Sequence, residues 1–163
     1  GLILIGGNQV MLGYLNDPAK TADAIVRLDG LRWYRTGDKG RIDKDGFLTI
    51  VDRYSRFAKI GGEMISLTSV EEAVRSVLDS PELQCVAVAI PDTKKGASIV
   101  LLINSSEIEG DETEDLTKRL IAQGLSPLMT PARIELVDEI PSLASGKTDF
   151  LSARKFALQV TAQ

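Results

Sequence analysis

The hydrophobic pattern of the first third of the chain predicts short strands and one tight hairpin. Residues 2–5 are a run of aliphatic side chains, which predicts a short apolar strand. Residues 40–43 lead into Lys44-Asp45-Gly46, and the apolar run 47–51 returns. Because glycine readily adopts a positive φ, Asp-Gly favours a tight turn, and residues 40–51 are expected to form a β-hairpin.

A short helix is expected to begin at Asp17. Aspartate can accept hydrogen bonds from the first free N–H groups of a helix, and Pro18 stands at the first helical position, where its missing N–H costs nothing. The pattern changes at residues 52–55, which are mostly polar. We therefore expect a domain boundary there, with residues 1–52 before it and residues 53–163 after it.

Beyond this boundary the pattern predicts a small α+β domain. A strand is expected at 57–60, followed by a turn at Gly61-Gly62-Glu63. Thr68 and Glu71 have the spacing of a capping box and predict the start of a helix. Its buried face is predicted by apolar residues at spacings of three and four: Val70, Ala73, Val74, Val77 and Leu78.

The remainder of the chain adds three strands and two helices to this prediction. The strands are expected at 83–90, 97–103 and 132–137. One helix is expected to open with Asp111 and Glu114, to carry Leu116 and Leu120, and to end at Gly124. The last helix is expected from the low 150s to about residue 158. The predicted fold is thus a short central sheet with about three helices.

Composition excludes several classes of site. The 163 residues include no histidine, which excludes Ser-His-Asp and Cys-His nucleophile pairs. The single cysteine, Cys85, cannot form an intrachain disulfide or a Cys-rich zinc site, and its apolar surroundings predict a core residue. A net charge of −4 does not favour nucleic-acid binding.

The sequence also bears on where the protein is located in the cell and on whether this chain is part of a longer one. The apolar runs are shorter than the roughly 18 residues of a transmembrane helix, so no membrane segment is expected. A lone cysteine is typical of a reducing compartment, which favours the cytoplasm. The chain opens at Gly1 with neither an initiator Met nor a basic leader, and we expect it to be part of a longer protein.

Three groups of residues could carry chemistry, and each alone has an ordinary explanation as well. Ser-Gly-Lys-Thr around Lys147 invites a P-loop interpretation, but the glycine that this motif requires is Pro141 here. Lys147 is then either a phosphate ligand or a solvated loop lysine. Asp38, after Thr-Gly, suits a pair of ribose hydroxyls or simply stabilises a turn.

The third group lies between residues 53 and 62. Arg53, Arg56 and Lys59 could meet a polyphosphate, or they could form a solvated face. The glycines at 61 and 62 could admit a ligand or make a turn.

Taken together, the order and spacing of these groups resemble the carboxy-terminal part of the adenylate-forming superfamily. This superfamily includes acyl-CoA synthetases, luciferases and peptide-synthetase adenylation domains. Residues 7–16 (GNQVMLGYLN) are similar to its GxxVxxGYxN stretch, and the resemblance extends from residue 2 to about 150. Residues 56–67 and 145–150 are more closely similar to the bifunctional acyl-[acyl-carrier-protein] synthetase/2-acylglycerophosphoethanolamine acyltransferase branch.

The resemblance implies a fold and an activity. Residues 1–52 would be the last strands of a large amino-terminal domain, and residues 53–163 a small lid domain that swings between two half-reactions. A fatty acid and ATP would give acyl-adenylate and pyrophosphate. A thiol of acyl carrier protein or CoA would then displace AMP, and a lysophospholipid would receive the acyl group through the parent enzyme, which is expected at the cytoplasmic membrane.

The resemblance also implies residue roles. Asp38 would bind the ATP ribose hydroxyls, and Arg53 the ribose or phosphates. Lys147 would contact the substrate carboxylate and the α-phosphate in the first half-reaction. A fixed cation there stabilises the negative charge of the transferring phosphoryl group. Mg²⁺ is expected with ATP, bound upstream of this chain, and no metal site is expected within the chain.

The second half-reaction would use another set of residues. Lys59 would face the adenylate, and Gly61 and Gly62 would line the path of the pantetheine thiol. Ser55 would occupy the hinge, where the family usually has Asp or Lys. Arg53, Arg56 and Lys59 would steer an acidic carrier protein toward the domain.

Two alternatives to a fatty-acid ligase remain. One is an adenylation domain for an amino or aryl acid, because the acyl pocket would lie upstream. The other is a lid-like interaction module without catalysis. If the parent is a ligase, the isolated chain is expected to be unable to complete the reaction, because the missing parts of the site would lie upstream.

Overall fold

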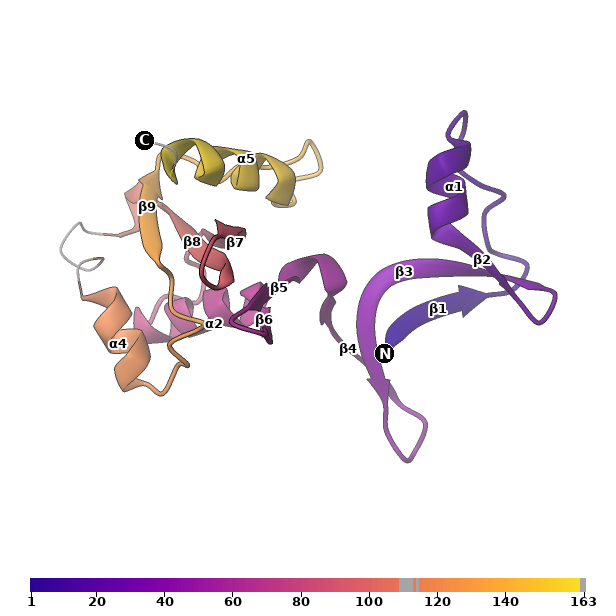
Figure 1. The fold of residues 1–163 in the computed structure, drawn as a ribbon, viewed down its shortest axis with the longest axis horizontal. Helices are drawn as coiled ribbons and strands as arrows, with labels where there is room; N and C mark the ends of the chain where they lie inside the picture. Colours follow the sequence, from indigo (N-terminus) through magenta and orange to yellow (C-terminus); the bar gives the residue numbers. More distant parts are fainter. Residues whose placement is uncertain (109–112, 114, 162–163) are drawn as a thin grey trace. The chain divides into compact units, whose positions relative to one another are not determined.

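The computed structural model describes residues 1–108, 113 and 115–161, which fall into two compact units, Gly1–Arg56 and Phe57–Gln163 (Figure 1). The division lies four residues beyond the boundary expected after residue 52. The short 3-10 helix η1 (Tyr54–Arg56) contacts β3 and so belongs to the first unit. Within the described residues, no helix is long and apolar enough to cross a membrane.

The first unit is an antiparallel sheet built around one long strand. Strand β3 (Leu31–Ile42) pairs with β1 (Leu2–Gly6), β2 (Ile25–Leu28) and β4 (Leu48–Arg53). Helix α1 (Pro18–Ala24) precedes β2. The pairing of β1 with β3 places residues 2–6 beside residues 33–39.

The local predictions for this unit are confirmed. Asp17 caps α1, and its Oδ1 accepts a hydrogen bond from the Lys20 N–H at 2.9 Å. The β3–β4 hairpin turns at residues 43–47, with Gly46 at φ +88°. Asp43, which the sequence did not single out, stabilises the turn, since its Oδ1 accepts from the N–H groups of Asp45 and Phe47, both at 2.9 Å.

The second unit is an α+β domain, as predicted. Its central sheet has the order β7-β8-β9, with β7 and β8 antiparallel and β8 and β9 parallel. A separate hairpin, β5–β6, precedes it. The elements are β5 (Phe57–Ile60), β6 (Glu63–Ser66), α2 (Leu67–Val77), β7 (Cys85–Asp92), β8 (Gly96–Asn104), η2 (Ser105–Glu107), α4 (Leu116–Ala122), β9 (Arg133–Val137) and α5 (Phe150–Thr161).

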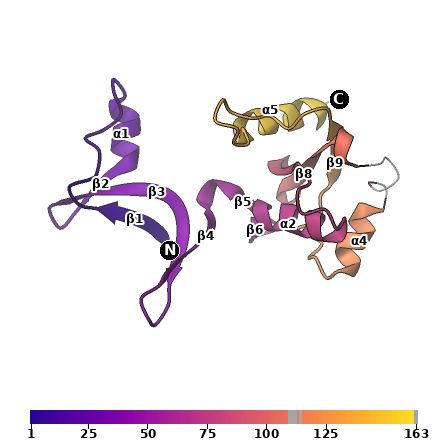
Figure 2. The ribbon, with the colours of Figure 1, turned by 180° about the vertical axis from the view of Figure 1, so that it is seen from behind.

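The central sheet lies between two layers of helices. Helices α2 and α4 cover one face and α5 covers the other, as the two opposite views show (Figures 1 and 2). Strand β8 alternates between the two cores. Ile99, Leu101 and Ile103 pack with α2 and α4, and Val100 and Leu102 pack with α5. All five are at most 1% exposed, which explains why this strand is an uninterrupted apolar run.

The start of α2 differs from the prediction. Its cap is Ser66, whose Oγ accepts from the Ser69 N–H at 3.1 Å, and not Thr68. Glu71 reaches the neighbouring sheet. It is 7% exposed, and its Oε1 accepts from the Ala87 N–H on β7 at 2.7 Å. Since β7 is an edge strand, this carboxylate pairs a backbone donor that no neighbouring strand reaches.

The other predicted helices are present. The expected opening of the second helix at Asp111 and Glu114 lies outside the described residues. The described helix α4 carries Leu116 and Leu120, both fully buried, and the chain turns at Gly124, with φ +89°. Helix α5 runs to Thr161, somewhat beyond the predicted end. Strand β6 was not predicted.

Candidate functional site

Asp38 and Arg53 lie side by side in the first unit. They are register partners on β3 and β4, and Arg53 Nε donates to Asp38 Oδ1 at 3.1 Å. The Asp38 side chain is 25% exposed and that of Arg53 69%. The antiparallel pairing of β3 with β4 therefore presents a carboxylate and a guanidinium together at the surface.

Thr36 fixes the backbone that carries Asp38. Its Oγ1 donates to the Ile3 carbonyl oxygen on β1 at 2.9 Å and accepts from the Asp38 N–H at 3.0 Å. Thr36 thus ties Asp38 to the neighbouring strand. The sequence analysis assigned it no role, because the contact with Ile3 joins residues far apart in the chain.

Two tyrosines adjoin this pair. The hydrogen bond that the Tyr34 hydroxyl donates to Tyr14, together with the charge of Tyr14 and desolvation, raises the pKa of Tyr34 above its ordinary value. Arg53 opposes this increase in the pKa and Asp38 adds to it, so both charged groups lie close enough to act on the phenol. Tyr14 was missed as a site residue, although it belongs to the GxxVxxGYxN stretch.

Ser55 and Arg56 follow this pair in η1. Ser55 is exposed, and its assignment as a hinge remains a prediction. Arg56 is 4% exposed and takes part in interactions of its own. Because its guanidinium is buried, Arg56 offers no surface contact to a partner, and the steering of an acidic carrier protein by Arg53, Arg56 and Lys59 stays a prediction. Arg53 and Lys59 are both exposed.

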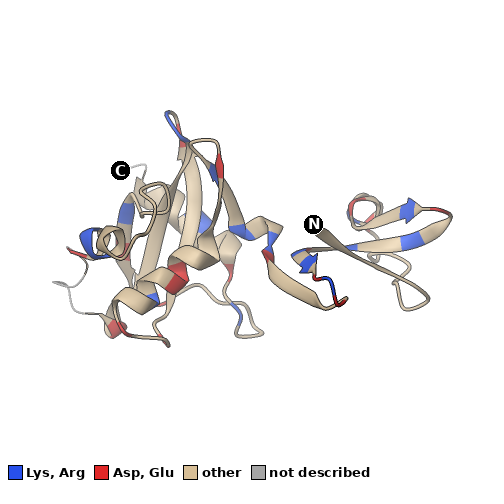
Figure 3. Ribbon diagram, turned by 90° about the horizontal axis from the view of Figure 1, so that it is seen from below, with Lys and Arg blue, Asp and Glu red and all other residues tan. Residues whose placement is uncertain are grey.

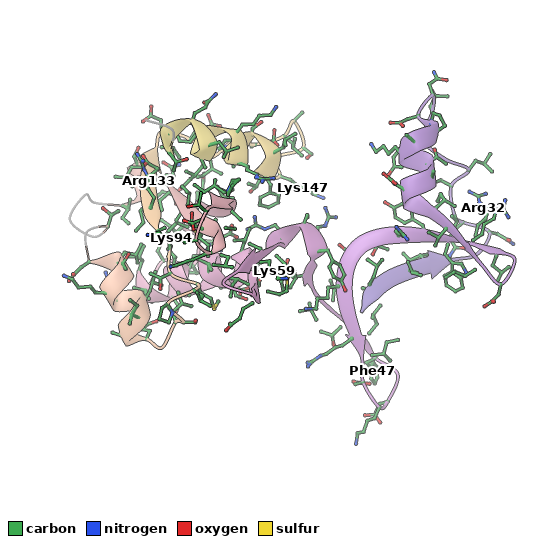
Figure 4. All side chains as sticks on the ribbon, in the orientation of Figure 1. Arg32, Phe47, Lys59, Lys94, Arg133 and Lys147 are labelled. Carbon is green, nitrogen blue, oxygen red and sulfur yellow. The ribbon has the colours of Figure 1, made fainter. Side chains whose placement is uncertain are left out.

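Lys59 lies on β5, between the buried residues Ala58 and Ile60 (Figure 4). Since side chains alternate along a strand, Lys59 points to solvent. Gly61 and Gly62 form the β5–β6 turn at φ +59° and +92°, conformations that residues with a Cβ rarely adopt. A Cβ at Gly61 would lie 3.2 Å from the Leu128 side chain, whereas a Cβ at Gly62 would meet nothing within 4 Å.

Lys147 lies on the loop between β9 and α5 (Figure 4). Its backbone carbonyl accepts from the Leu143 N–H at 2.8 Å, and its side chain is exposed. Within the described part of the chain, neither Lys147 nor Lys59 forms an ion pair. The charges of both lysines are therefore available to a ligand.

Cys85 is confirmed as a core residue. Burial raises the pKa of its thiol to about 11, so it stays protonated at neutral pH and is not an activated nucleophile. It borders a cavity of about 490 Å³ that Gly146 and Thr148 of the Lys147 loop also line. Among residues 1–108, 113 and 115–161, no cluster of three or more acidic or cysteine side chains could hold a metal ion.

The charged residues of the two units are interspersed in sign. Basic and acidic positions both occur along the ribbon of each unit (Figure 3). Asp38, Arg53, Lys59 and Lys147 carry charged groups of the kinds that bind nucleotides. A carboxylate can accept from two ribose hydroxyls, and a lysine can stabilise a phosphoryl oxygen.

A family model and several known proteins are similar to this chain. The model of the AMP-binding enzyme C-terminal domain family matches residues 69–147. Phenyloxazoline synthase MbtB of Mycobacterium sp. (strain MCS) is 32% identical over 149 residues, covering 91% of this chain and 13% of that enzyme. Probable acyl-activating enzyme 4 of Arabidopsis thaliana is 32% identical over 158 residues, covering 96% of this chain and 28% of that enzyme.

A solved structure is similar over both units. It is o-succinylbenzoate CoA synthetase (MenE) from Bacillus subtilis in complex with its acyl-adenylate intermediate, with a TM-score of 0.75 and 26% identity. The match covers 94% of this chain and 30% of that enzyme. This chain therefore spans less than a third of each of these three proteins.

Proposed function

We propose that this chain is the carboxy-terminal part of a longer adenylate-forming ligase, because the model of the AMP-binding enzyme C-terminal domain family matches residues 69–147. The observation that carries the proposal is the match itself, which runs through the second unit and ends on Lys147. Residues 1–52 would complete a larger amino-terminal domain. In support, β4 and its hairpin expose apolar side chains to between 52% and 71%: Ile42, Phe47, Leu48, Ile50 and Val51.

The proposed reaction has two half-reactions. In the first, a carboxylate oxygen of the acid attacks the α-phosphorus of ATP, and the bond to the bridging oxygen breaks with release of pyrophosphate. In the second, a thiolate sulfur attacks the acyl carbon of the adenylate, and AMP leaves with the electrons of the broken C–O bond. Mg²⁺, held by the upstream part of the enzyme, would neutralise phosphate charge when bound.

Asp38 and Arg53 are proposed to bind the nucleotide. Their pairing presents an acceptor for the ribose hydroxyls next to a cation for the ribose or phosphates. Asp38→Ala in the full-length enzyme is expected to raise the KM for ATP roughly 10- to 100-fold, because a charge-assisted hydrogen bond contributes about 1.5–3 kcal/mol. Steady-state kinetics at varied ATP measure this. Asp45→Ala, on the exposed hairpin turn, is the matched control. An unchanged KM in the Asp38 variant would remove Asp38 from the nucleotide site.

Lys59 is proposed to act in the second half-reaction, with Gly61 and Gly62 beside the path of the thiol. The lysine is exposed on β5 next to the glycine turn and forms no ion pair with the residues that the structure describes. Lys59→Ala is expected to slow thiolysis of preformed acyl-adenylate about tenfold or more, the effect of losing one charge-assisted contact, and to leave adenylate formation unchanged. Single-turnover assays separate the two steps, with the exposed Lys94→Ala as control. Equal loss in both steps would contradict this role.

A fatty acid is the proposed substrate, and a carrier-protein or CoA thiol is the proposed acceptor. Support comes from the likeness of residues 56–67 and 145–150 to the bifunctional acyl-carrier-protein synthetase/acyltransferase branch. In that branch the acyl group passes on to a lysophospholipid, which we propose as the final acceptor of the parent enzyme.

An aryl or amino acid is the second candidate substrate. It is favoured by two similar proteins, an o-succinylbenzoate CoA synthetase and a phenyloxazoline synthase, whose names indicate aromatic products or substrates. The residues proposed here to bind the nucleotide and to stabilise charge would serve either class of substrate. The groups that distinguish the two classes would lie in the upstream domain.

The experiment that tests the proposed function is ATP–pyrophosphate exchange by the full-length protein. The panel contains a long-chain fatty acid, an aryl acid and a mixture of amino acids. Exchange that depends on the fatty acid supports the preferred substrate, and exchange with another acid selects the second candidate. Absence of exchange with every acid, together with no binding of ATP, would overturn the ligase and favour a non-catalytic module.

A further inference from the structure

Lys147 stands on a small hairpin that joins β9 to α5. Three backbone pairs close this hairpin: Pro141 with Asp149, Ser142 with Thr148, and Leu143 with Lys147. The Asp149 N–H donates to the Pro141 carbonyl oxygen at 2.8 Å, and the Leu143 N–H donates to the Lys147 carbonyl oxygen at 2.8 Å. The backbone of Lys147 is therefore held at the last pair before the turn.

The tip of the hairpin is a tight three-residue loop. The Gly146 N–H donates to the Leu143 carbonyl oxygen at 2.8 Å, and Gly146 has φ +77°. This is the combination of a turn and a left-handed residue that closes three-residue hairpin loops, and it favours glycine at that position. The tip thus has its own hydrogen bonds, and the orientation of the whole hairpin depends on its base.

Asp149 fastens that base to α5. Its Oδ1 accepts from the N–H groups of Leu151 and Ser152, each at 3.1 Å, and its Oδ2 accepts from Ser152 Oγ at 2.7 Å. Its carbonyl oxygen accepts from the Ala153 N–H at 3.0 Å. One residue therefore contributes its N–H to the hairpin and its carboxylate and carbonyl to the first turn of the helix.

The cap is intact over the neutral range of pH. The hydrogen bonds from Ser152 and Leu151 hold the pKa of Asp149 below its ordinary value, so the carboxylate is ionised at neutral pH. A lowered pKa in the folded state means that the stabilisation is fully present above the unfolded pKa of about 3.9 and is lost as pH falls through the folded pKa. Physiological changes of pH leave this connection unaltered.

Helix α5 is itself firmly placed. Ala153 and Ala157 are fully buried against the residues of β7 and β8 that face this side of the sheet. Ile140, which precedes the hairpin, is 8% exposed and belongs to the same core. Both ends of the Lys147 hairpin are thus anchored to one apolar cluster, the first through Ile140 and the second through Asp149 and α5.

We propose that Asp149 is a positioning residue for Lys147, which holds the lysine hairpin against α5 in the geometry that adenylate formation requires. The inference rests on the proposed function of Lys147. Asp149 touches no reacting atom and acts through the backbone of the hairpin. Removal of the Asp149 carboxylate leaves the Lys147 side chain unchanged but lets the hairpin depart from its orientation. The first half-reaction therefore slows, and the second does not.

The test uses Asp149→Ala, Asp149→Asn and Ser66→Ala in the full-length protein. Asp149→Ala is expected to lower the kcat of pyrophosphate exchange about tenfold, equivalent to about 1.4 kcal/mol, with unchanged KM for ATP and unchanged thiolysis of acyl-adenylate. Asp149→Asn keeps an oxygen for the N–H groups of Leu151 and Ser152 and is expected to restore most of the rate. Ser66→Ala removes the cap of α2, a helix that carries no part of the hairpin, and is expected to leave kcat unchanged.

A second measurement does not depend on activity. Hydrogen exchange at the amides of Leu143 and Gly146 is expected to be faster in Asp149→Ala than in wild type, Asp149→Asn or Ser66→Ala. If the wild-type protein catalyses no ATP–pyrophosphate exchange with any acid, the proposed function fails. The hydrogen-exchange rates of the amides still decide whether Asp149 holds the hairpin. Unchanged amide rates in Asp149→Ala, or a loss of kcat that Ser66→Ala matches, would overturn the proposal.

Discussion

Replacement of Lys147 by alanine is expected to slow adenylate formation by the full-length enzyme about 10²- to 10³-fold, the effect of removing one preorganised charge-stabilising group. The side chain is exposed and forms no ion pair within the described residues, so its charge is available to a ligand, and hydrogen bonds of the hairpin hold its backbone. Negative charge that develops on the phosphoryl oxygens would meet it in the first half-reaction. ATP–pyrophosphate exchange measures the loss.

The second half-reaction provides the control for this prediction, because Lys147 is proposed to act only in the first. Thiolysis of preformed acyl-adenylate by the Lys147→Ala variant is expected to match wild type, and Lys94→Ala, an exposed lysine on another turn, is expected to leave exchange unchanged. If Lys147→Ala exchanged pyrophosphate at the wild-type rate, the ligase assignment could stand, but the catalytic role of this lysine could not.

Leu101→Ala is expected to lower the free energy of unfolding of the second unit by about 2–5 kcal/mol, the usual effect of truncating a fully buried leucine. Leu101 is 0% exposed at the centre of β8 and packs in the core shared with α2 and α4. Strands on both sides hold β8 in place, so the core cannot easily collapse into the space left by the side chain. Urea unfolding followed by circular dichroism, with hydrogen exchange of β8 amides, gives the change.

Leu151 provides the matched substitution. It is 65% exposed on α5, and Leu151→Ala is expected to change the free energy of unfolding by no more than about 0.5 kcal/mol. If the two variants had the same stability, or if Leu101→Ala lost less than about 1 kcal/mol, the assignment of β8 as the central element of the core would be wrong.

The fold could be predicted where the signal is local. The apolar run of β8, the Asp17 cap and the Asp-Gly turn each depend on a few adjacent residues, and each is present. The cap of α2 was predicted wrongly because Ser66 and Thr68 are both acceptable capping residues, and the choice between them depends on where β6 ends. Strand β6 itself is short and partly polar, and only its pairing with β5 identifies it.

The candidate site could be predicted in its charged residues but not in the contacts that place them. Asp38, Arg53, Lys59 and Lys147 were named from motifs, and their roles remain predictions. Hydrogen bonds between distant segments, such as Thr36 with Ile3, leave no mark on the local sequence. The burial of Arg56 was missed for the same reason, since an isolated arginine in a polar stretch is usually solvated.

The parallel pairing of β8 with β9 determines the order in which the second unit can assemble. Strands β7 and β8 are neighbours along the chain and can pair as soon as both are synthesised, because hairpin contacts are local. Strand β9 follows only after α4, so the second edge of β8 stays open until residues 133–137 emerge from the ribosome. An apolar strand with an open edge can pair with other chains, and in a nascent polypeptide this interval is the one in which the domain most needs protection from aggregation.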